Sequence, residues 1–125
     1  MMSAFRDFHK SLSHAWDGLC FAFRQERSFR IQIAATLVVF IALVLLPLER
    51  WERVILLMAT AMVLVLELVN SMVERFVDLV KPRLHSYVKE IKDLMAAAVL
   101  VAAVFAAVIG ILILAPYAQT VLGRV

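Results

Sequence analysis

The stretch VILLMATAMVLVLELVNSMVERFVD, residues 54–78, joins an apolar segment directly to a polar one. Its first thirteen residues carry no charge, and its last twelve contain two glutamates, an asparagine, a serine and an aspartate. No glycine or proline interrupts the stretch, so a single helix is predicted to run from the apolar part into the polar part. The pattern indicates a membrane helix whose polar end needs an explanation.

The rest of the chain is just as apolar. It has 125 residues, of which 64% are hydrophobic and 18% charged, and its mean hydropathy is +0.92. A soluble domain of this size has too much surface to hide so many apolar side chains. Three glycines and three prolines favour helices with short connections, and the single cysteine, Cys20, excludes an intramolecular disulfide. We expect one all-α membrane domain over residues 1–125, without a cleavable signal peptide.

Four helices are predicted. An amphipathic helix over about residues 4–27 is expected at the membrane interface, because Phe5, Phe8, Leu12 and Trp16 recur every three or four residues. A soluble surface helix is the alternative, which the apolar segments that follow make less favourable. Three membrane spans are predicted, at about residues 29–48, 52–80 and 92–118. The segments PLER at 47–50 and KPRLHS at 81–86 are expected to connect them.

The basic residues indicate the orientation. Ten Lys and Arg lie in the N-terminal region and around the second connection, and three lie at the other ends of the spans: Arg50, Arg53 and Arg124. Basic residues favour the cytoplasmic side, so the N-terminus is expected inside and the C-terminus outside the cytoplasmic (inner) membrane. Trp51 and Tyr117 would then belong to an outer aromatic belt.

The polar residues of the stretch 54–78 share one face. At 100° per residue, Glu67, Asn70, Ser71, Glu74 and Asp78 fall within a sector of about 100°. The plain interpretation is a helix leaving the membrane, which suits Asp78 but not Glu67. An intramembrane carboxylate costs several kcal/mol and usually marks a functional site. We therefore interpret the face as functional.

Carboxylates one or two turns apart suit a hard cation such as Mg²⁺. The predicted cytoplasmic rim also gathers charged residues from other segments, namely Glu26, Lys92 and Asp93. Carboxylates, a divalent metal and a lysine are the parts of a phosphoryl-transfer site. The glycines are Gly18, Gly110 and Gly123, so no glycine-rich phosphate loop can be built, and any nucleotide must be held by side chains and metal.

Four motifs together resemble the prokaryotic diacylglycerol kinase family, which includes the undecaprenol kinases. They are ExxNSxxExxVD at 67–78, KDxxAAAVL at 92–100, WDGL at 16–19 and ERSFR at 26–30. The resemblance implies a homotrimer of three-span subunits, each with an amphipathic N-terminal helix. It also implies transfer of the γ-phosphate of MgATP to the hydroxyl of a membrane lipid.

The resemblance implies a role for each matching residue. Glu67 would be the general base on the lipid hydroxyl, and Glu26 and Glu74 would hold Mg²⁺. Residues implied to lie at the nucleotide are Glu26, Glu74, Asp78, Arg83, His85, Lys92 and Asp93. Residues implied to lie at the lipid substrate are Trp16, Ser28, Phe29, Arg30, Glu67, Asn70 and Ala96.

Three alternatives remain open at this point. The lipid is diacylglycerol, giving phosphatidic acid, or undecaprenol, because both present a hydroxyl on an apolar tail. The chain could instead be a small ion or proton conduit with the polar face lining a pore. A family member with a purely structural or regulatory role is the third alternative, and joint retention of Glu26, Glu67, Asn70, Glu74 and Lys92–Asp93 argues against it.

Overall fold

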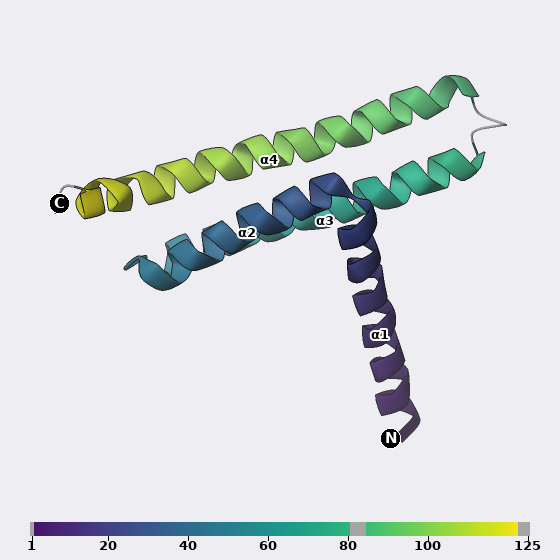
Figure 1. Cartoon of the computed structure of the whole chain (residues 1–125), viewed down its shortest axis with the longest axis horizontal. Helices are drawn as coiled ribbons and strands as arrows, with labels where there is room; N and C mark the ends of the chain where they lie inside the picture. The colour runs from purple at the N-terminus through teal and green to yellow at the C-terminus, as the bar shows by residue number, and fades with distance from the viewer. Residues whose placement is uncertain (1, 81–84, 123–125) are drawn as a thin grey trace.

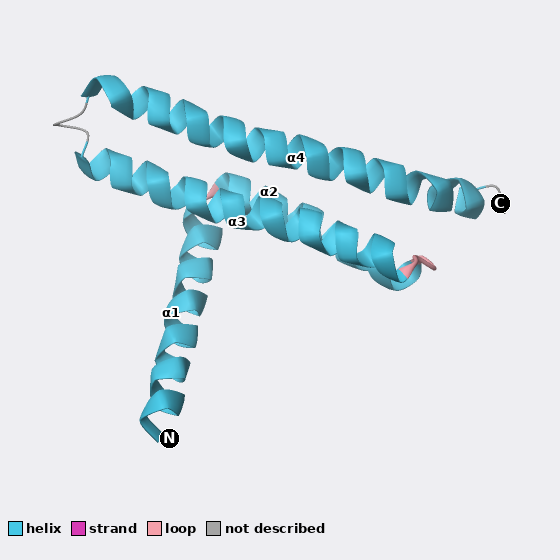
Figure 2. Ribbon diagram, turned by 180° about the vertical axis from the view of Figure 1, so that it is seen from behind, coloured by secondary structure: helices cyan, strands magenta, loops and turns pink. Residues whose placement is uncertain are grey.

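The computed structural model describes residues 2–80 and 85–122, which are helical almost throughout (Figure 2). Four helices follow one another along the chain: α1 (Met2–Gln25), α2 (Arg27–Leu45), α3 (Arg50–Val80) and α4 (His85–Leu122). The all-α prediction is therefore confirmed.

Three of the helices form a bundle and the fourth stands across it. Helices α2, α3 and α4 run along one another, while α1 projects at a steep angle from the start of α2 (Figure 1). Helix α3 is central, because it packs against both α2 and α4. Each of the three bundle helices is long and apolar enough to cross a membrane. The chain is a multi-pass membrane protein.

The junctions between the first three helices have local causes. Glu26 has extended backbone angles, with φ −105° and ψ 114°, and this residue separates α1 from α2. Helix α2 ends at Leu45, three residues before the predicted limit, because Pro47 pushes the preceding Leu46 out of the helical region. Leu46 accordingly has φ −95° and ψ 144°. Helix α3 continues without a break through the polar face, as the sequence predicts.

Helix α4 begins earlier than predicted. It starts at His85, seven residues before the expected limit at Lys92, so the predicted connection over 81–86 is too long at its C-terminal end. Hydropathy reports where a segment becomes apolar enough for lipid, whereas charged residues such as Lys89 and Glu90 form helix readily in water. Near its other end the helix continues past Pro116 to Leu122.

A small core closes the end of the bundle that is opposite to the polar face. Leu43, Leu48, Leu56 and Ile113 bury one another there, and Tyr117 packs against them. Glu52 is only 9% exposed. Its Oε2 accepts hydrogen bonds from the backbone N–H of Glu49 at 2.8 Å and from the Tyr117 hydroxyl at 2.5 Å. The first bond resembles half of a capping box, and the second joins the start of α3 to α4.

Loss of the bond from Tyr117 is expected to destabilise the bundle. Tyr117→Phe removes a hydroxyl that donates to a buried carboxylate, and bonds of this kind contribute about 1.5–3 kcal/mol. We expect thermal unfolding in detergent micelles, followed by circular dichroism, to begin at lower temperature in this variant. Tyr87→Phe is the matched control because Tyr87 is exposed. Equal unfolding temperatures for the two variants would show that the hydrogen bond from Tyr117 to Glu52 does not stabilise the bundle.

Much of the apolar surface has no partner within one chain. The aromatic and leucine side chains of α1 are exposed, with Trp16 at 67%, and exposed leucines and valines cover α2 and α4. Three helices alone cannot bury such surface, which is suited to lipid or to further subunits.

Candidate active site

The polar face of α3 is graded in burial. Glu67 is 4% exposed and Ser71 is also buried. Asn70 and Glu74 are partly buried, and Asp78 is exposed. The face therefore runs from a carboxylate enclosed by the protein to one in contact with solvent, along about three helical turns.

Glu67 is a residue of α3, and its side chain faces the start of α2. The Ser28 hydroxyl hydrogen-bonds to its carboxylate, and the carboxylates of Glu74 and Glu26 are close enough to interact with it electrostatically. Ser71 Oγ donates to the Glu67 carbonyl oxygen at 3.1 Å, so this hydroxyl is used within the helix. The charges of Glu74 and Glu26 therefore both act on Glu67, from α3 itself and from the residue before α2.

Asn70 uses one of its two polar side-chain atoms in a hydrogen bond to Glu74. Its Nδ2 donates to Glu74 Oε1 at 3.4 Å. Its Oδ1 is buried and has no hydrogen-bond partner among the described residues. A buried acceptor without a partner costs about 1–3 kcal/mol, so such an atom is usually satisfied by a water, a substrate or an ion.

Two ion pairs bring neighbouring elements onto the same face. Arg75 Nη2 pairs with Glu26 Oε1 at 2.8 Å, and Lys92 Nζ pairs with Asp78 Oδ1 at 2.7 Å. Glu26 and Lys92, two residues of the predicted rim, are therefore each paired with a residue of α3. Asp93, a third residue of that rim, follows Lys92 on α4 and is exposed.

Arg75 was missed by the sequence analysis. On a helical wheel it lies about 80° from Glu67, at the border of the polar face. Its long side chain nevertheless reaches Glu26, and its guanidinium carbon lies 4.3 Å from the centre of the Phe21 ring on α1. The signal available in the sequence was its border position combined with the reach of an arginine side chain.

The remaining predicted residues lie in different surroundings. Phe29 is buried at 3% exposure, and Arg30 donates to the carbonyl oxygens of Phe23 and Arg24 at 3.2 and 3.1 Å. Trp16 lies on α1 and is exposed. Ala96 is exposed on α4. Arg83 and the side chain of His85 lie outside the described residues.

The carboxylates suit a metal that arrives with phosphate oxygens. Within residues 2–80 and 85–122, no three His, Cys, Asp or Glu side chains form a ready-made metal cluster. Mg²⁺ usually takes one or two carboxylates, waters and substrate phosphates, so it does not need such a cluster. Glu26 and Glu74 both approach Glu67, and Asn70 Oδ1 is free to accept a bond. The residues therefore fit Mg²⁺.

An apolar groove runs along the bundle about one helical turn from this site, with Val63, four residues before Glu67, in its lining. It has a volume of about 600 Å³ and lies between α2, α3 and α4. Gln32, one turn after Ser28, lines its near end, and Ala118 lines its far end. The Thr36 and Thr60 hydroxyls in its wall each donate to a backbone carbonyl of their own helix at 2.7 Å. Their polar groups are therefore satisfied, and the groove suits hydrocarbon.

Comparison with known proteins connects this site to a family. Residues 13–114 match the model of the prokaryotic diacylglycerol kinase family. The chain belongs to the prokaryotic diacylglycerol kinase family. The match includes every element of the candidate site, from Glu26 to Asp93.

Named relatives of this family are lipid kinases. The chain is 38% identical to a diacylglycerol kinase of Synechocystis sp. over 107 residues, which are 85% of this chain and 61% of that protein. It is 38% identical to an undecaprenol kinase of Bacillus subtilis over 109 residues, 87% of this chain and 89% of that protein. It is 30% identical to a diacylglycerol kinase of Escherichia coli over 99 residues, 79% and 81% of the two chains. Membership of a lipid kinase family is therefore shown.

Proposed function

We propose that this prokaryotic diacylglycerol kinase family member transfers the γ-phosphate of MgATP to the hydroxyl of diacylglycerol, which gives phosphatidic acid. The observation that carries the proposal is the position of Glu67: a buried carboxylate, bonded to Ser28, one helical turn from Val63 in the lining of an apolar groove and beside two more exposed carboxylates. A lipid can bring its hydroxyl to such a site from the membrane, and a nucleotide can reach it from water.

Each residue has a separate task in this proposal. Glu67 takes the proton from the lipid hydroxyl, and Ser28 keeps its carboxylate in place. Asn70 Oδ1 accepts a hydrogen bond at the site, which satisfies its buried oxygen. Glu26 and Glu74 hold Mg²⁺, which neutralises charge on the phosphates when it is bound. Lys92, steered by Asp78, adds a positive charge on the α4 side.

The substrate is tested by offering both lipids together with labelled ATP. Diacylglycerol and undecaprenol are presented to the purified protein at matched mole fraction in mixed micelles, and each phosphorylated product is quantified. We expect label in diacylglycerol in a Mg²⁺-dependent reaction. Label in undecaprenol alone would assign the activity named for the Bacillus subtilis relative. Label in neither lipid would refute the kinase proposal, and ion flux into vesicles would then be the measurement to make.

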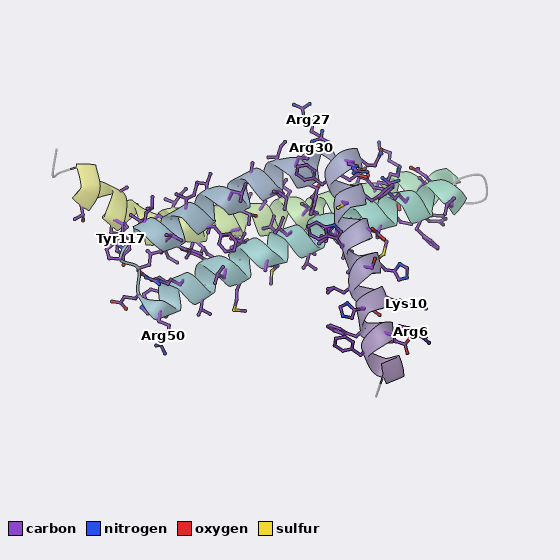
Figure 3. The ribbon with its side chains drawn as sticks, turned by 60° about the horizontal axis from the view of Figure 1, so that its bottom comes forward. Arg6, Lys10, Arg27, Arg30, Arg50 and Tyr117 are labelled. Atoms are coloured by element: carbon purple, nitrogen blue, oxygen red, sulfur yellow. The ribbon has the colours of Figure 1, made fainter. Side chains whose placement is uncertain are left out.

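Assembly and orientation belong to the same proposal. We propose a homotrimer with the N-terminus and the polar face at the cytoplasmic side, and with α1 lying along the membrane interface. The angle between α1 and the bundle suits this position (Figure 1). Arg6, Lys10, Arg27 and Arg30 lie on α1 and at its junction with α2, whereas Arg50 and Tyr117 lie at the opposite end (Figure 3). The unburied apolar surface supports further subunits.

A further inference from the structure

Arg75 holds together three elements of the candidate site. From α3 it forms an ion pair with Glu26, at the junction of α1 and α2, with an N–O distance of 2.8 Å. The same guanidinium lies over the ring of Phe21 at 4.3 Å, in the last part of α1. A single side chain therefore contacts both the Glu26 carboxylate and the last part of α1.

The negative charges around Glu67 favour a cation beside Glu26. Glu26 and Glu74 both act on Glu67 with like charge. Arg75 forms the ion pair with Glu26 and offsets its charge. A divalent cation on Glu26 would offset the same charge. A guanidinium and a metal ion that share one carboxylate repel each other, so binding of one weakens binding of the other.

We infer that Arg75 is a positioning residue that substitutes for the metal at Glu26 and is displaced from it when the metal binds. This inference rests on the proposed role of Glu26 as a metal ligand. Displacement also withdraws the guanidinium from Phe21, so metal binding loosens α1. Arg75 thus contacts Glu26 and α1 together, and a metal at Glu26 would release both contacts.

Exposure makes the pair weak enough to exchange. The side chains of Arg75 and Glu26 are 47% and 24% exposed. Ion pairs that remain in contact with solvent contribute little, because water and salt screen them. Removing the pair should therefore change metal affinity by about two- to fivefold. The cation–π contact with Phe21 also holds the Arg75 guanidinium beside Glu26, and it is lost when the guanidinium moves away.

The direct test is binding of Mn²⁺ alone to the purified protein, followed by electron paramagnetic resonance of the free ion. Arg75→Gln is expected to bind Mn²⁺ about two- to fivefold more tightly than wild type. Arg75→Lys keeps the charge and is expected to stay close to wild type. Arg27→Gln is the matched control, because Arg27 carries the same charge one residue from Glu26 and is exposed, pointing away from the helices (Figure 3).

The outcomes separate this inference from the proposed function. If Arg75→Gln and Arg27→Gln bind Mn²⁺ alike, the competition does not exist and the inference is overturned. If Glu26→Gln leaves Mn²⁺ binding unchanged, Glu26 is not a ligand and the proposed metal role itself fails. If Arg75→Gln binds Mn²⁺ more tightly than wild type and Arg27→Gln does not, the result supports both the competition and the metal role of Glu26.

Motion of α1 gives a second readout that is independent of affinity. In a Trp51→Phe background, Trp16 is the remaining tryptophan and reports on α1. Saturating Mg²⁺ is expected to lower its fluorescence anisotropy in the presence of Arg75. In Arg75→Gln, anisotropy should be low already and should not respond to Mg²⁺. Equal responses with and without Arg75 would overturn the link between metal binding and α1.

Discussion

Glu67→Gln is expected to lower the rate of lipid phosphorylation by about 10²- to 10⁴-fold, the usual contribution of a general base. Glutamine has nearly the same shape and can still accept the hydrogen bond from Ser28, so the bundle should fold normally. It cannot take a proton from the lipid hydroxyl. The measurement is the initial rate in mixed micelles at saturating ATP and lipid, with the KM for ATP determined in parallel.

A control for this variant lies in the same helix. Glu52 is also a buried carboxylate, but it sits at the other end of α3 and bonds to Tyr117. Glu52→Gln should lower thermal stability and leave the rate per folded molecule unaffected. If Glu67→Gln keeps more than about a tenth of the wild-type rate, Glu67 is not the base. A loss of rate in both variants would point to a general effect of removing buried charge.

The course of the helices was largely predictable from the sequence, because lipid requires long uninterrupted apolar helices. The unbroken α3 followed from the lack of glycine and proline between Val54 and Asp78. The end of α2 at Leu45 could have been predicted too, since Pro47 restricts the residue before it. The start of α4 at His85 could not, because hydropathy marks the membrane limit rather than the first helical residue.

The candidate site was predictable where its residues share one helix. Helical angles place Glu67, Asn70 and Glu74 on one face without any knowledge of neighbouring helices. The partners across helices were not predictable in this way. Arg75 reaches Glu26 across 49 positions, and Tyr117 reaches Glu52 across 65. Such pairs depend on how the helices pack and on the length of the side chains. A helical wheel shows only the angular position of each residue around one helix.

Asn70 was predictable in its position on α3 but not in its hydrogen bonding. Its Nδ2 donates to Glu74, and its Oδ1 is buried and has no hydrogen-bond partner in the part of the chain that the structure describes. The wheel predicted that Asn70 shares the face, but only the structure shows that one of its groups lacks a partner. This unsatisfied oxygen is the part of the protein that most plainly calls for a ligand.

Glu74→Gln is expected to raise the Mg²⁺ concentration needed for half-maximal activity by at least about 10- to 100-fold. Removing groups that only support a metal ligand already weakens metal binding by this factor, and Glu74 is proposed to be a ligand itself. Glutamine keeps an oxygen that can accept from Asn70 Nδ2, so the local hydrogen bond at 3.4 Å can persist. Lost charge, rather than lost shape, is then the cause of the change.

The measurement is the rate of lipid phosphorylation against free Mg²⁺ at fixed ATP. Glu90→Gln is the control, because Glu90 is an exposed acid on α4 and its loss changes the net charge equally. We expect the Glu74→Gln curve to move to higher Mg²⁺ and the Glu90→Gln curve to overlay wild type. Since Glu26 remains in Glu74→Gln, high Mg²⁺ should restore part of the rate, whereas no Mg²⁺ concentration should restore Glu67→Gln. A Glu74→Gln curve that overlays wild type would place the metal away from the polar face of α3.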